Sequence, residues 1–374
     1  MATIFIGEDV FQLPVLSPLQ SAESVMPINF EQLDHCPVCG HKGFRVEYGN
    51  VKDYLCDVEG SFSYVRCDNC QLVFLNPRPT AEDLAKCYVD YHTHQAEPLA
   101  KSFLEPWGNP NRWIRGGILA KKYGYTHLAP SAFATYAACL LDILPSIRQR
   151  ARCGLGSGAA SGLPHFTGNG RALDIGTGSG IYAATLKRLG WQISGVDFDA
   201  QAAEVAAACH NLTIYKEKLD SIGFTDSHFD FISMFDVIEH LAAPLHDLRE
   251  CYRIIRPGGR IMIRTPNYDS LTRKKFGMYW RGLEAPRHLC LFNADNLKYV
   301  VESVGFRVVK HASSDKGTAF YMNSSQTFQQ KATNADTANT TGQVQITLAK
   351  LRIQLLAAFG QKTGDVLHLE AIRP

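Results

Sequence analysis

Short apolar segments alternate with helical patterns in the second half of the chain. Residues 172–175, 191–196, 229–235 and 260–264 form short apolar runs, which are typical of buried parallel strands. Helical periodicity fills the intervals at 182–189, 200–209 and 245–255, and Gly190 and the segment 257–259 end two of these helices. Strands that alternate with helices in this way predict an α/β fold built on a doubly wound parallel sheet.

The remaining segments predict a different character for each part of the chain. Residues 1–30 have weak periodicity and predict a loosely ordered arm, whereas 31–80 carry two cysteine pairs among short β-rich pieces. Residues 81–150 predict a helical cap or substrate region, and 151–170 a linker rich in glycine, serine and alanine. Residues 313–342 are polar and predict a loop, and 365–371 predict a last strand.

One further helix is expected over residues 343–359. Its apolar residues recur at helical spacing, and they are Val344, Leu348, Leu351, Leu355 and Phe359. This stripe favours a helix that packs on the core or on a partner. A helix lying on a membrane surface is the alternative.

Bulk composition narrows the classes of protein. The 374 residues include 38 basic and 36 acidic side chains, for a formal net charge of +2, which argues against a broad nucleic-acid surface. No apolar run approaches the roughly 18 residues of a transmembrane helix, and no signal-peptide pattern opens the sequence. Seven of the 11 cysteines lack metal-binding spacing and are interpreted as reduced thiols, so we expect a cytoplasmic protein. The sequence leaves the oligomeric state open.

A glycine-rich loop follows the first predicted strand. Asp174 precedes a G-x-G-x-G turn formed by Gly176, Thr177, Gly178 and Gly180, and a helix begins directly after it. Glycines allow a tight turn and a close approach of the backbone to a ligand, and the helix start offers free N–H groups. The spacing differs from the G-x-G-x-x-G dinucleotide pattern. Asp174 would repel a pyrophosphate, whereas it suits a cationic amino group.

A second acidic residue stands where nucleotide-binding α/β folds hold ribose. Asp197 ends the next strand, 23 positions after Asp174. Together with this loop, residues 171–309 resemble the class I S-adenosylmethionine (SAM)-dependent methyltransferases. Further matches occur in the family's order, at 196–199, 218–219, 229–236, 248–259 and 265–267.

The resemblance implies a Rossmann-like, seven-stranded methyltransferase sheet over 171–374, with its core at 171–310 and the last helix and strand at 343–374. It also implies SAM as the cofactor. Phe198 would lie beside Asp197 at the ribose, Lys218 and Leu219 would line the adenine, and Phe235 and Asp236 would close the site. A related fold that binds another nucleotide, or a copy without catalytic activity, remains the alternative.

Four cysteines have the spacing of a zinc ribbon. Cys36 and Cys39 form one C-x2-C pair, and Cys67 and Cys70 form another after a gap of 27 residues. Two such pairs can present four thiolates to a structural Zn²⁺, and redox chemistry is the alternative. Cys56, inside the gap, is interpreted as a packing residue. With residues 72–79, the ribbon resembles the N-terminal module of a bacterial methyltransferase group.

The segment after the fourth strand indicates the acceptor class. Asp236, Glu239 and His240 stand at i, i+3 and i+4, on one face of an expected helix start. They resemble the E-x-x-E-H of ubiquinone-type O-methyltransferases, with aspartate in place of the first glutamate. That resemblance implies that these side chains can hold a divalent ion such as Mg²⁺; the alternative is that they line the pocket without metal. The motif of amino-group methylases, Asn/Asp-Pro-Pro-Tyr/Phe, is missing at this point.

The loop at 280–289 is the second candidate for acceptor chemistry. Loops at this position cover the carboxyl ends of the strands, where ligands bind. His288 is a candidate general base, Arg287 could hold an acidic group of the substrate, and Trp280 could stack on a ring. The alternative is a structural loop whose histidine bonds to backbone. His92 and His94 are weaker candidates in a segment that resembles a pocket cover.

These observations favour methylation of a small molecule or glycan precursor, at oxygen in preference to carbon or nitrogen. The catalytic candidates are His288, His240 and Glu239. No nucleic-acid partner is expected, because the ribbon and its flanks do not interleave basic and aromatic residues. A zinc-ribbon RNA methyltransferase and a SAM-binding protein without turnover remain alternative hypotheses.

Overall fold

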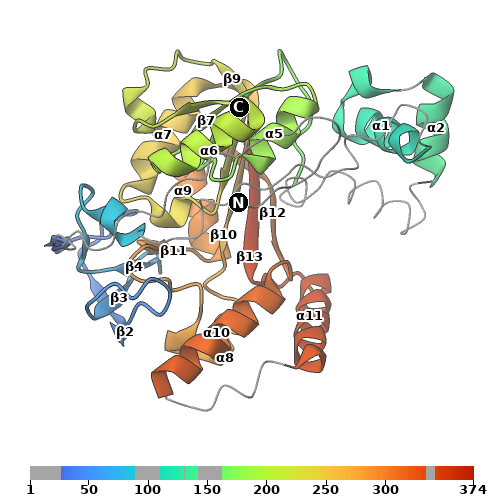
Figure 1. The fold of residues 1–374 in the computed structure, drawn as a ribbon. Coiled ribbons are helices and arrows are strands. Elements are labelled where there is room, and N and C mark those ends of the chain that lie inside the picture. Colours follow the sequence, from blue (N-terminus) through green and yellow to red (C-terminus); the bar gives the residue numbers. More distant parts are fainter. Residues whose placement is uncertain (1–26, 89–109, 130, 142–161, 334–341) are drawn as a thin grey trace, which may run out of the picture.

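The computed structural model describes residues 27–88, 110–129, 131–141, 162–333 and 342–374 (Figure 1). The candidates His92 and His94 lie outside these residues, as do most of the expected arm and linker. Among the described helices, none combines the length and the apolar character that a membrane span requires.

A seven-stranded sheet forms the centre of the molecule, and its order is β12-β13-β10-β9-β6-β7-β8. Its strands are β6 (Arg171–Ile175), β7 (Gln192–Val196), β8 (Thr213–Tyr215), β9 (Phe229–Phe235), β10 (Ile255–Pro266), β12 (Arg307–Ser314) and β13 (Val366–Ile372). β13 runs antiparallel to both of its neighbours, whereas the pairs among β6 to β10 are parallel. The predicted α/β fold with a seven-stranded sheet is confirmed.

Helices at the expected positions pack against these strands. They are α5 (Ile181–Arg188), α6 (Ala200–His210), α7 (Pro244–Ile254) and α9 (Ala294–Ser303). Local capping explains two of the starts: the Asp199 side chain accepts hydrogen bonds from the first turn of α6, and Asn293 forms a reciprocal capping box with Asn296 at α9. The parallel strands therefore end at the edge where the loops before α5, α6 and α7 begin.

The cysteine-bearing segment folds into a second sheet of order β11-β4-β3-β2. Three of its strands are local, namely β2 (Phe44–Val51), β3 (Phe62–Cys67) and β4 (Val73–Leu75), and a separate pair joins β1 (Phe30–Glu31) to β5 (Arg78–Pro79). The edge strand β11 (Cys290–Leu291) comes from the segment between β10 and α9, within the part of the chain that forms the central sheet. One apolar cluster also runs from this sheet into the central sheet, so the two sheets share a core.

A buried ion pair joins the same two parts. The Arg287 guanidinium donates to both carboxylate oxygens of Asp53, with two N–O distances of 2.8 Å, and the side chains are 0% and 1% exposed. Arg287 also donates to the Cys87 carbonyl. Burial alone would raise the pKa of Asp53, but the hydrogen bonds and charge of Arg287 lower it. The role expected for Arg287 as a substrate ligand is therefore wrong.

Short helices surround the two sheets. The described parts of 81–150 contain η1 (Leu84–Tyr88), α1 (Pro110–Tyr123), η4 (Thr126–Leu128) and α2 (Ala132–Leu141). Single turns occur at η5 (Leu219–Ser221), η6 (Ile238–His240) and η7 (Gly277–Tyr279), and α8 covers Leu271–Phe276. Figure 1 shows α1 and α2 together at one side, away from α10 and α11.

The polar segment predicted as a loop contains a helix, α10 (Thr318–Thr333), so that expectation is wrong. Its buried face is formed by Thr318, Met322, Ser325 and Phe328, which recur every three or four residues. Tertiary bonds satisfy the two hydroxyl groups, since Thr318 donates to Asp365 and Ser325 accepts from the Arg281 N–H. Small polar residues on the buried face hid the amphipathic pattern.

The expected C-terminal helix is present as α11 (Gln343–Ala358), but its orientation differs from the expectation. Ile346 and Ile353 are buried against the rest of the protein. The stripe of five apolar residues, which was expected to pack on the core or on a partner, does not pack on the core and is exposed. Ile346 and Ile353, which lie between the positions of the expected stripe, are thus the residues through which α11 packs on the rest of the protein.

Replacing Arg287 tests whether the buried ion pair joins the two parts. We expect Arg287→Ala to lower the free energy of unfolding by about 3–5 kcal/mol, because it leaves the Asp53 carboxylate buried and unpaired. Arg45→Ala is the matched control: Arg45 pairs with Asp68 at the surface, with both side chains about half exposed, and should cost under about 1 kcal/mol. Equal losses in urea unfolding of the two variants would contradict this interpretation.

Candidate active site

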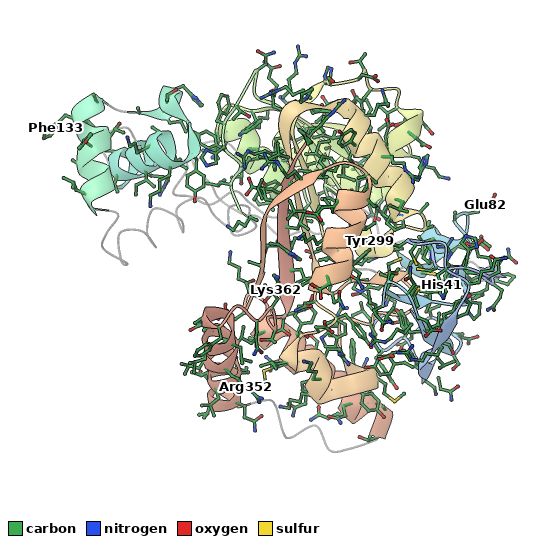
Figure 2. The ribbon with its side chains drawn as sticks, turned by 180° about the vertical axis from the view of Figure 1, so that it is seen from behind. His41, Glu82, Phe133, Tyr299, Arg352 and Lys362 are labelled. Carbon is green, nitrogen blue, oxygen red and sulfur yellow. The ribbon has the colours of Figure 1, made fainter. Side chains whose placement is uncertain are left out.

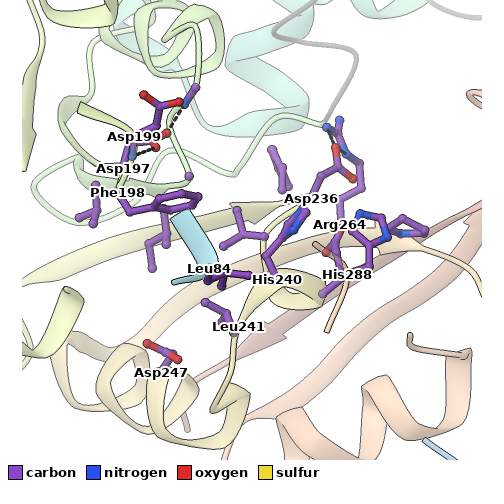
Figure 3. Close-up of a pocket in the computed structure, with 18 of the residues that line it drawn as sticks. Leu84, Asp197, Phe198, Asp199, Asp236, His240, Leu241, Asp247, Arg264 and His288 are labelled. Carbon is purple, nitrogen blue, oxygen red and sulfur yellow. Dashed lines mark hydrogen bonds and ion pairs between the residues drawn. The ribbon is translucent and has the colours of Figure 1, made fainter. Parts of the chain in front are cut away.

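A cavity of about 980 Å³ opens at the carboxyl ends of the parallel strands. Its lining includes the glycine-rich loop after β6, the end of β7, residues 217–220, and the end of β9 (Figure 3). The opposite side is formed by η1, by the loop at 281–288 and by the start of α10. This volume lies at the upper end of the range of roughly 300–1,000 Å³ for small-molecule sites, which leaves room for two ligands.

The glycine-rich loop requires its glycines for different reasons. Gly176, Gly178 and Gly180 all have positive φ, at 71°, 51° and 76°. A Cβ on Gly176 would lie 2.2 Å from Val237 Cγ2, whereas a Cβ on Gly178 would meet no atom within 4 Å. Gly176 and Gly178 line the cavity, and Gly178 turns its open side to free space. A ligand can therefore approach the backbone closely at Gly178.

The end of β7 contacts this loop. The Gly178 N–H donates to Asp197 Oδ2 at 2.6 Å, and the Asp199 N–H donates to Oδ1 at 3.0 Å (Figure 3). Asp197 and Phe198 line the cavity, and the Phe198 ring packs edge-on against Tyr88. Lys218, Leu219, Phe235 and Asp236 line it as well. Thr177 and Gly180 instead support the loop from outside the cavity, since Thr177 Oγ1 donates to the Asp174 carbonyl.

Asp174 is buried beneath the loop, at 3% exposure. Ser233 Oγ donates to its Oδ1 at 2.6 Å. Burial raises the pKa of Asp174 to about 7, although the Ser233 hydrogen bond lowers it in part. A cation bound nearby would favour the ionised carboxylate.

The segment after β9 does not form the helix start that the sequence predicted. Asp236 adopts a positive φ of 56° and forms an ion pair with Arg264, and only the single turn η6 follows. The three side chains that are close enough to bind one metal ion are Glu239, His240 and His288, whose donor atoms lie within 4.8 Å of one another. Asp236 is not in this group, because its backbone turn and its pairing with Arg264 direct it elsewhere.

Glu239 is a buried carboxyl group with one unsatisfied oxygen. Oε2 accepts a hydrogen bond of 2.9 Å from Thr265, and Oε1 has no hydrogen-bond partner among the described residues. Burial, with a smaller effect of Asp236, raises the pKa of Glu239 well above its usual value. The protonated form of Glu239 is therefore favoured over that of an exposed glutamate, and a cation beside it would oppose this shift.

The imidazole of His240 is held through one nitrogen. Nδ1 lies 3.0 Å from the Arg287 carbonyl oxygen and 2.7 Å from the Tyr88 hydroxyl. A carbonyl only accepts, so Nδ1 carries the proton and Nε2 carries the lone pair. No described residue bonds to Nε2, and burial lowers the pKa of His240. The ring lines the cavity as a neutral imidazole with a free acceptor nitrogen.

His288 is placed differently, although it also lines the cavity. Its Nδ1 donates to the Gly282 carbonyl at 2.8 Å, and its Nε2 lies 3.4 Å from Glu284 Oε2. Burial lowers the pKa of His288 to about 3. Both nitrogens face protein acceptors, and the ring packs edge-on against His240 (Figure 3). These contacts match the structural-loop alternative for His288.

Buried ion pairs and hydrogen bonds hold the loop at 281–288, which carries His288. Glu284 pairs with Arg281 and Arg287, and Tyr64 donates to the carbonyls of Leu283 and His288. Burial alone would raise the pKa of Glu284, but His288 and the two arginines lower it. Trp280 is only 1% exposed and does not line the cavity, so its expected stacking role is wrong.

Sequence reasoning missed several cavity residues. Lys316, Phe320 and Tyr321 line the cavity from the start of α10, and His368 lines it from β13. The polar composition of 313–342 concealed the first three. Tyr88 also lines the cavity and contacts His240 directly.

Cys36, Cys39, Cys67 and Cys70 converge in the ribbon, and their Sγ atoms lie within 4.8 Å of one another. Both pairs adopt one turn geometry: Cys36 N–H donates to the His41 carbonyl and Cys67 N–H to the Leu72 carbonyl, five residues on. The Sγ distances are 3.6 Å for Cys36–Cys70 and 3.5 Å for Cys39–Cys67. Tetrahedral Zn²⁺ with bonds of about 2.3 Å needs sulfurs about 3.8 Å apart, so the donor set fits zinc. Cys56 lies outside this cluster.

Comparison with known proteins identifies similar chains. Residues 141–311 match a methyltransferase domain family. A probable SAM-dependent methyltransferase of Mycolicibacterium smegmatis is 31% identical over 147 residues, which cover 39% of this chain and 55% of that protein. The ubiquinone biosynthesis O-methyltransferase of Vibrio cholerae is 29% identical over 103 residues, or 26% and 42% of the two chains. The matches thus span about half the length of these relatives.

Among solved structures, a SAM-dependent methyltransferase from Archaeoglobus fulgidus aligns with 63% of this chain and 99% of its own. The sequence identity is 21% and the TM-score is 0.40.

Proposed function

From the match of residues 141–311 to a methyltransferase domain family, we propose that this chain transfers a methyl group from SAM to a small-molecule or glycan-precursor acceptor. Oxygen is the favoured acceptor atom, and carbon or nitrogen are the alternatives. The observation that carries the proposal is the single cavity that joins the glycine-rich loop to the His240 side chain. Similarity to ubiquinone biosynthesis O-methyltransferases supports the choice of oxygen.

The cofactor would occupy the end of the cavity next to the glycine-rich loop. Gly176 and Gly178 would contact it through their backbone, with Thr177 and Gly180 holding the turn, and Asp174 would balance the charge of its amino group. Asp197 and Phe198 would bind the ribose, Lys218 and Leu219 the adenine, and Phe235 and Asp236 would close the site. SAM supplies an activated methyl group on a sulfonium; the protein aligns the acceptor with it.

His240 is the proposed general base. Its Nδ1–H is held by the Arg287 carbonyl, so the Nε2 lone pair can take the proton of an acceptor hydroxyl. His288 would position His240 through ring contact, and protonated Glu239 could donate a hydrogen bond to the acceptor.

A divalent ion at Glu239, His240 and His288 is the alternative for this end of the cavity. Two imidazoles and one carboxylate suit zinc or another transition metal better than Mg²⁺, which prefers oxygen ligands. The donor set therefore argues against the Mg²⁺ suggested by the E-x-x-E-H resemblance.

Two other functions remain as alternatives, an RNA methyltransferase and a SAM-binding protein without turnover. Retardation of bulk RNA at moderate salt would favour the first. Failure of every acceptor in a nucleophile library, despite SAM binding, would favour the second.

For the ribbon we propose one structural Zn²⁺ on Cys36, Cys39, Cys67 and Cys70. For the chain we propose a cytoplasmic location, which is consistent with the absence of disulfide bonds among the described cysteines.

Calorimetry with Asp174→Asn tests the cofactor site. SAM affinity should fall about 10-fold at pH 7.5, because the variant lacks the carboxylate beneath the loop whose charge would balance the cationic amine of SAM. With a pKa of about 7, Asp174 is increasingly protonated in the free wild type below that pH, so the difference should narrow towards pH 6. Asp226→Asn, at an exposed carboxylate outside the cavity, is the control. An unchanged affinity at pH 7.5 would rule out this role.

Turnover of a hydroxyl acceptor tests His240 as the base. His240→Gln should keep SAM affinity and reduce kcat about 10²–10⁴-fold. Because the pKa of His240 is lowered, the wild-type kcat should persist as pH falls through 6.5 and decline only below it. His288→Gln should reduce kcat less, because both ring nitrogens of His288 face protein oxygen atoms and neither is free to accept a proton from the substrate. A full kcat in His240→Gln would leave alignment as the main catalytic contribution.

Elemental analysis tests the ribbon. We expect about one zinc per chain, and Cys39→Ser should lose metal and thermal stability together, because thiolate ligation is coupled to local folding. Cys56→Ser should retain zinc, since Cys56 lies outside the cluster. A metal-free, fully folded preparation would refute the zinc proposal.

A further inference from the structure

The exposed face of α11 is an unusual surface feature. Five apolar side chains form one stripe along it, and their exposed fractions run from 51% to 79%: Val344, Leu348, Leu351, Leu355 and Phe359. On the opposite side of the same helix, Ile346 and Ile353 are buried at 4% and 1%. A helix that is apolar on two faces needs a second partner, because contiguous apolar surface of this kind marks an interaction site.

The charged residues of α11 itself and of its flanking sequence are of one sign. Residues 337–364 contain Lys350, Arg352 and Lys362 and not a single acidic residue. Arg352 directly follows Leu351 and is exposed, and Figure 2 shows it on α11, with Lys362 in the segment that follows the helix. An exposed stripe of leucine and phenylalanine on a helix whose own charged residues are all cations is typical of a helix that lies in the headgroup region of an anionic membrane.

A second copy of the chain fits these charges less well. Packing the stripe of one copy against that of another would bring the two Arg352 side chains, near the middle of the stripe, towards each other. Like charges that meet at an interface oppose association. An anionic lipid surface complements the same charges and accepts the apolar side chains without a matching surface.

The position of α11 also connects it with the cavity. Gln354 Nε2 donates to Asp315 Oδ2 at 2.8 Å, and the next two residues, Lys316 and Gly317, line the cavity. Phe320, at the start of α10, lines it too and is 54% exposed. A surface that holds α11 would therefore lie close to this rim of the cavity.

We propose that α11 is an interfacial anchor, which inserts its apolar stripe into an anionic lipid surface and brings the Lys316 rim of the cavity to the membrane. The anchor needs no methyl transfer, so lipid binding can be tested separately from the proposed function. It is a reversible attachment in the plane of the surface and involves no membrane-spanning segment.

Vesicle flotation of the full chain tests this anchor. The protein should float with mixed phosphatidylcholine–phosphatidylglycerol vesicles, and weakly or not at all with phosphatidylcholine alone. The double variant Leu351→Gln/Leu355→Gln should lower partitioning at least about 10-fold, because it removes two apolar side chains from the lipid. Val46→Gln/Tyr299→Gln is the matched control, since both residues are exposed on other elements, at 69% and 49%.

Charge is tested by a second pair of substitutions. Arg352→Gln/Lys362→Gln should weaken binding to the anionic vesicles about five-fold per cation removed. Every variant should keep the thermal melting curve of the wild type, since the replaced side chains project from the surface.

Three results would overturn the proposal. The first is a wild-type protein that stays unbound with anionic vesicles, for instance because another segment of the chain covers the stripe. The second is equal binding by the Leu351→Gln/Leu355→Gln variant and its control. The third is a dimer, detected by light scattering, that the same variant dissociates, because the occupant would then be a second copy.

Discussion

The buried charge of Arg287 constrains the rest of the structure. A guanidinium without solvent requires anionic partners, and it finds Asp53 in the ribbon and Glu284 in its own loop. The ribbon therefore has to pack where the loop at 281–288 closes the cavity. β11 and Tyr64 reinforce the same contact, because one adds a strand to the ribbon sheet and the other donates to two loop carbonyls. Zinc in the ribbon would thus stabilise an active-site wall as well as the ribbon itself.

The two ends of the cavity are built on different principles. At the cofactor end, one strand, one turn and the next strand end supply most contacts, and the Gly178–Asp197 hydrogen bond joins them directly. At the acceptor end, His240, Tyr88, His288 and Lys316 come from four distant segments. Their mutual placement depends on the shared core, whereas the contacts around the glycine-rich loop are local.

Burial assigns the titratable groups their roles. Asp174 and Glu239 are carboxyl groups with raised pKa values, whereas His240 and His288 are imidazoles with lowered ones. Burial therefore favours the uncharged forms of Glu239, His240 and His288. A neutral imidazole with one nitrogen fixed and the other free is suited to proton transfer, and a neutral carboxyl group can donate a hydrogen bond.

The sequence by itself determined the central sheet, its helices, the glycine-rich loop and the four converging cysteines. These features depend on local periodicity and on fixed spacing, and both can be recognised from residues that are close together in the sequence. Only the tertiary structure decided the role of Arg287, the helix α10 and the face that α11 exposes. Arg287 and Asp53 are 234 positions apart, and nothing near either one indicates its partner. Likewise, Thr318 and Ser325 suit a buried helix face only because Asp365 and the Arg281 backbone satisfy their hydroxyl groups, and long-range partners of this kind leave no pattern along the chain.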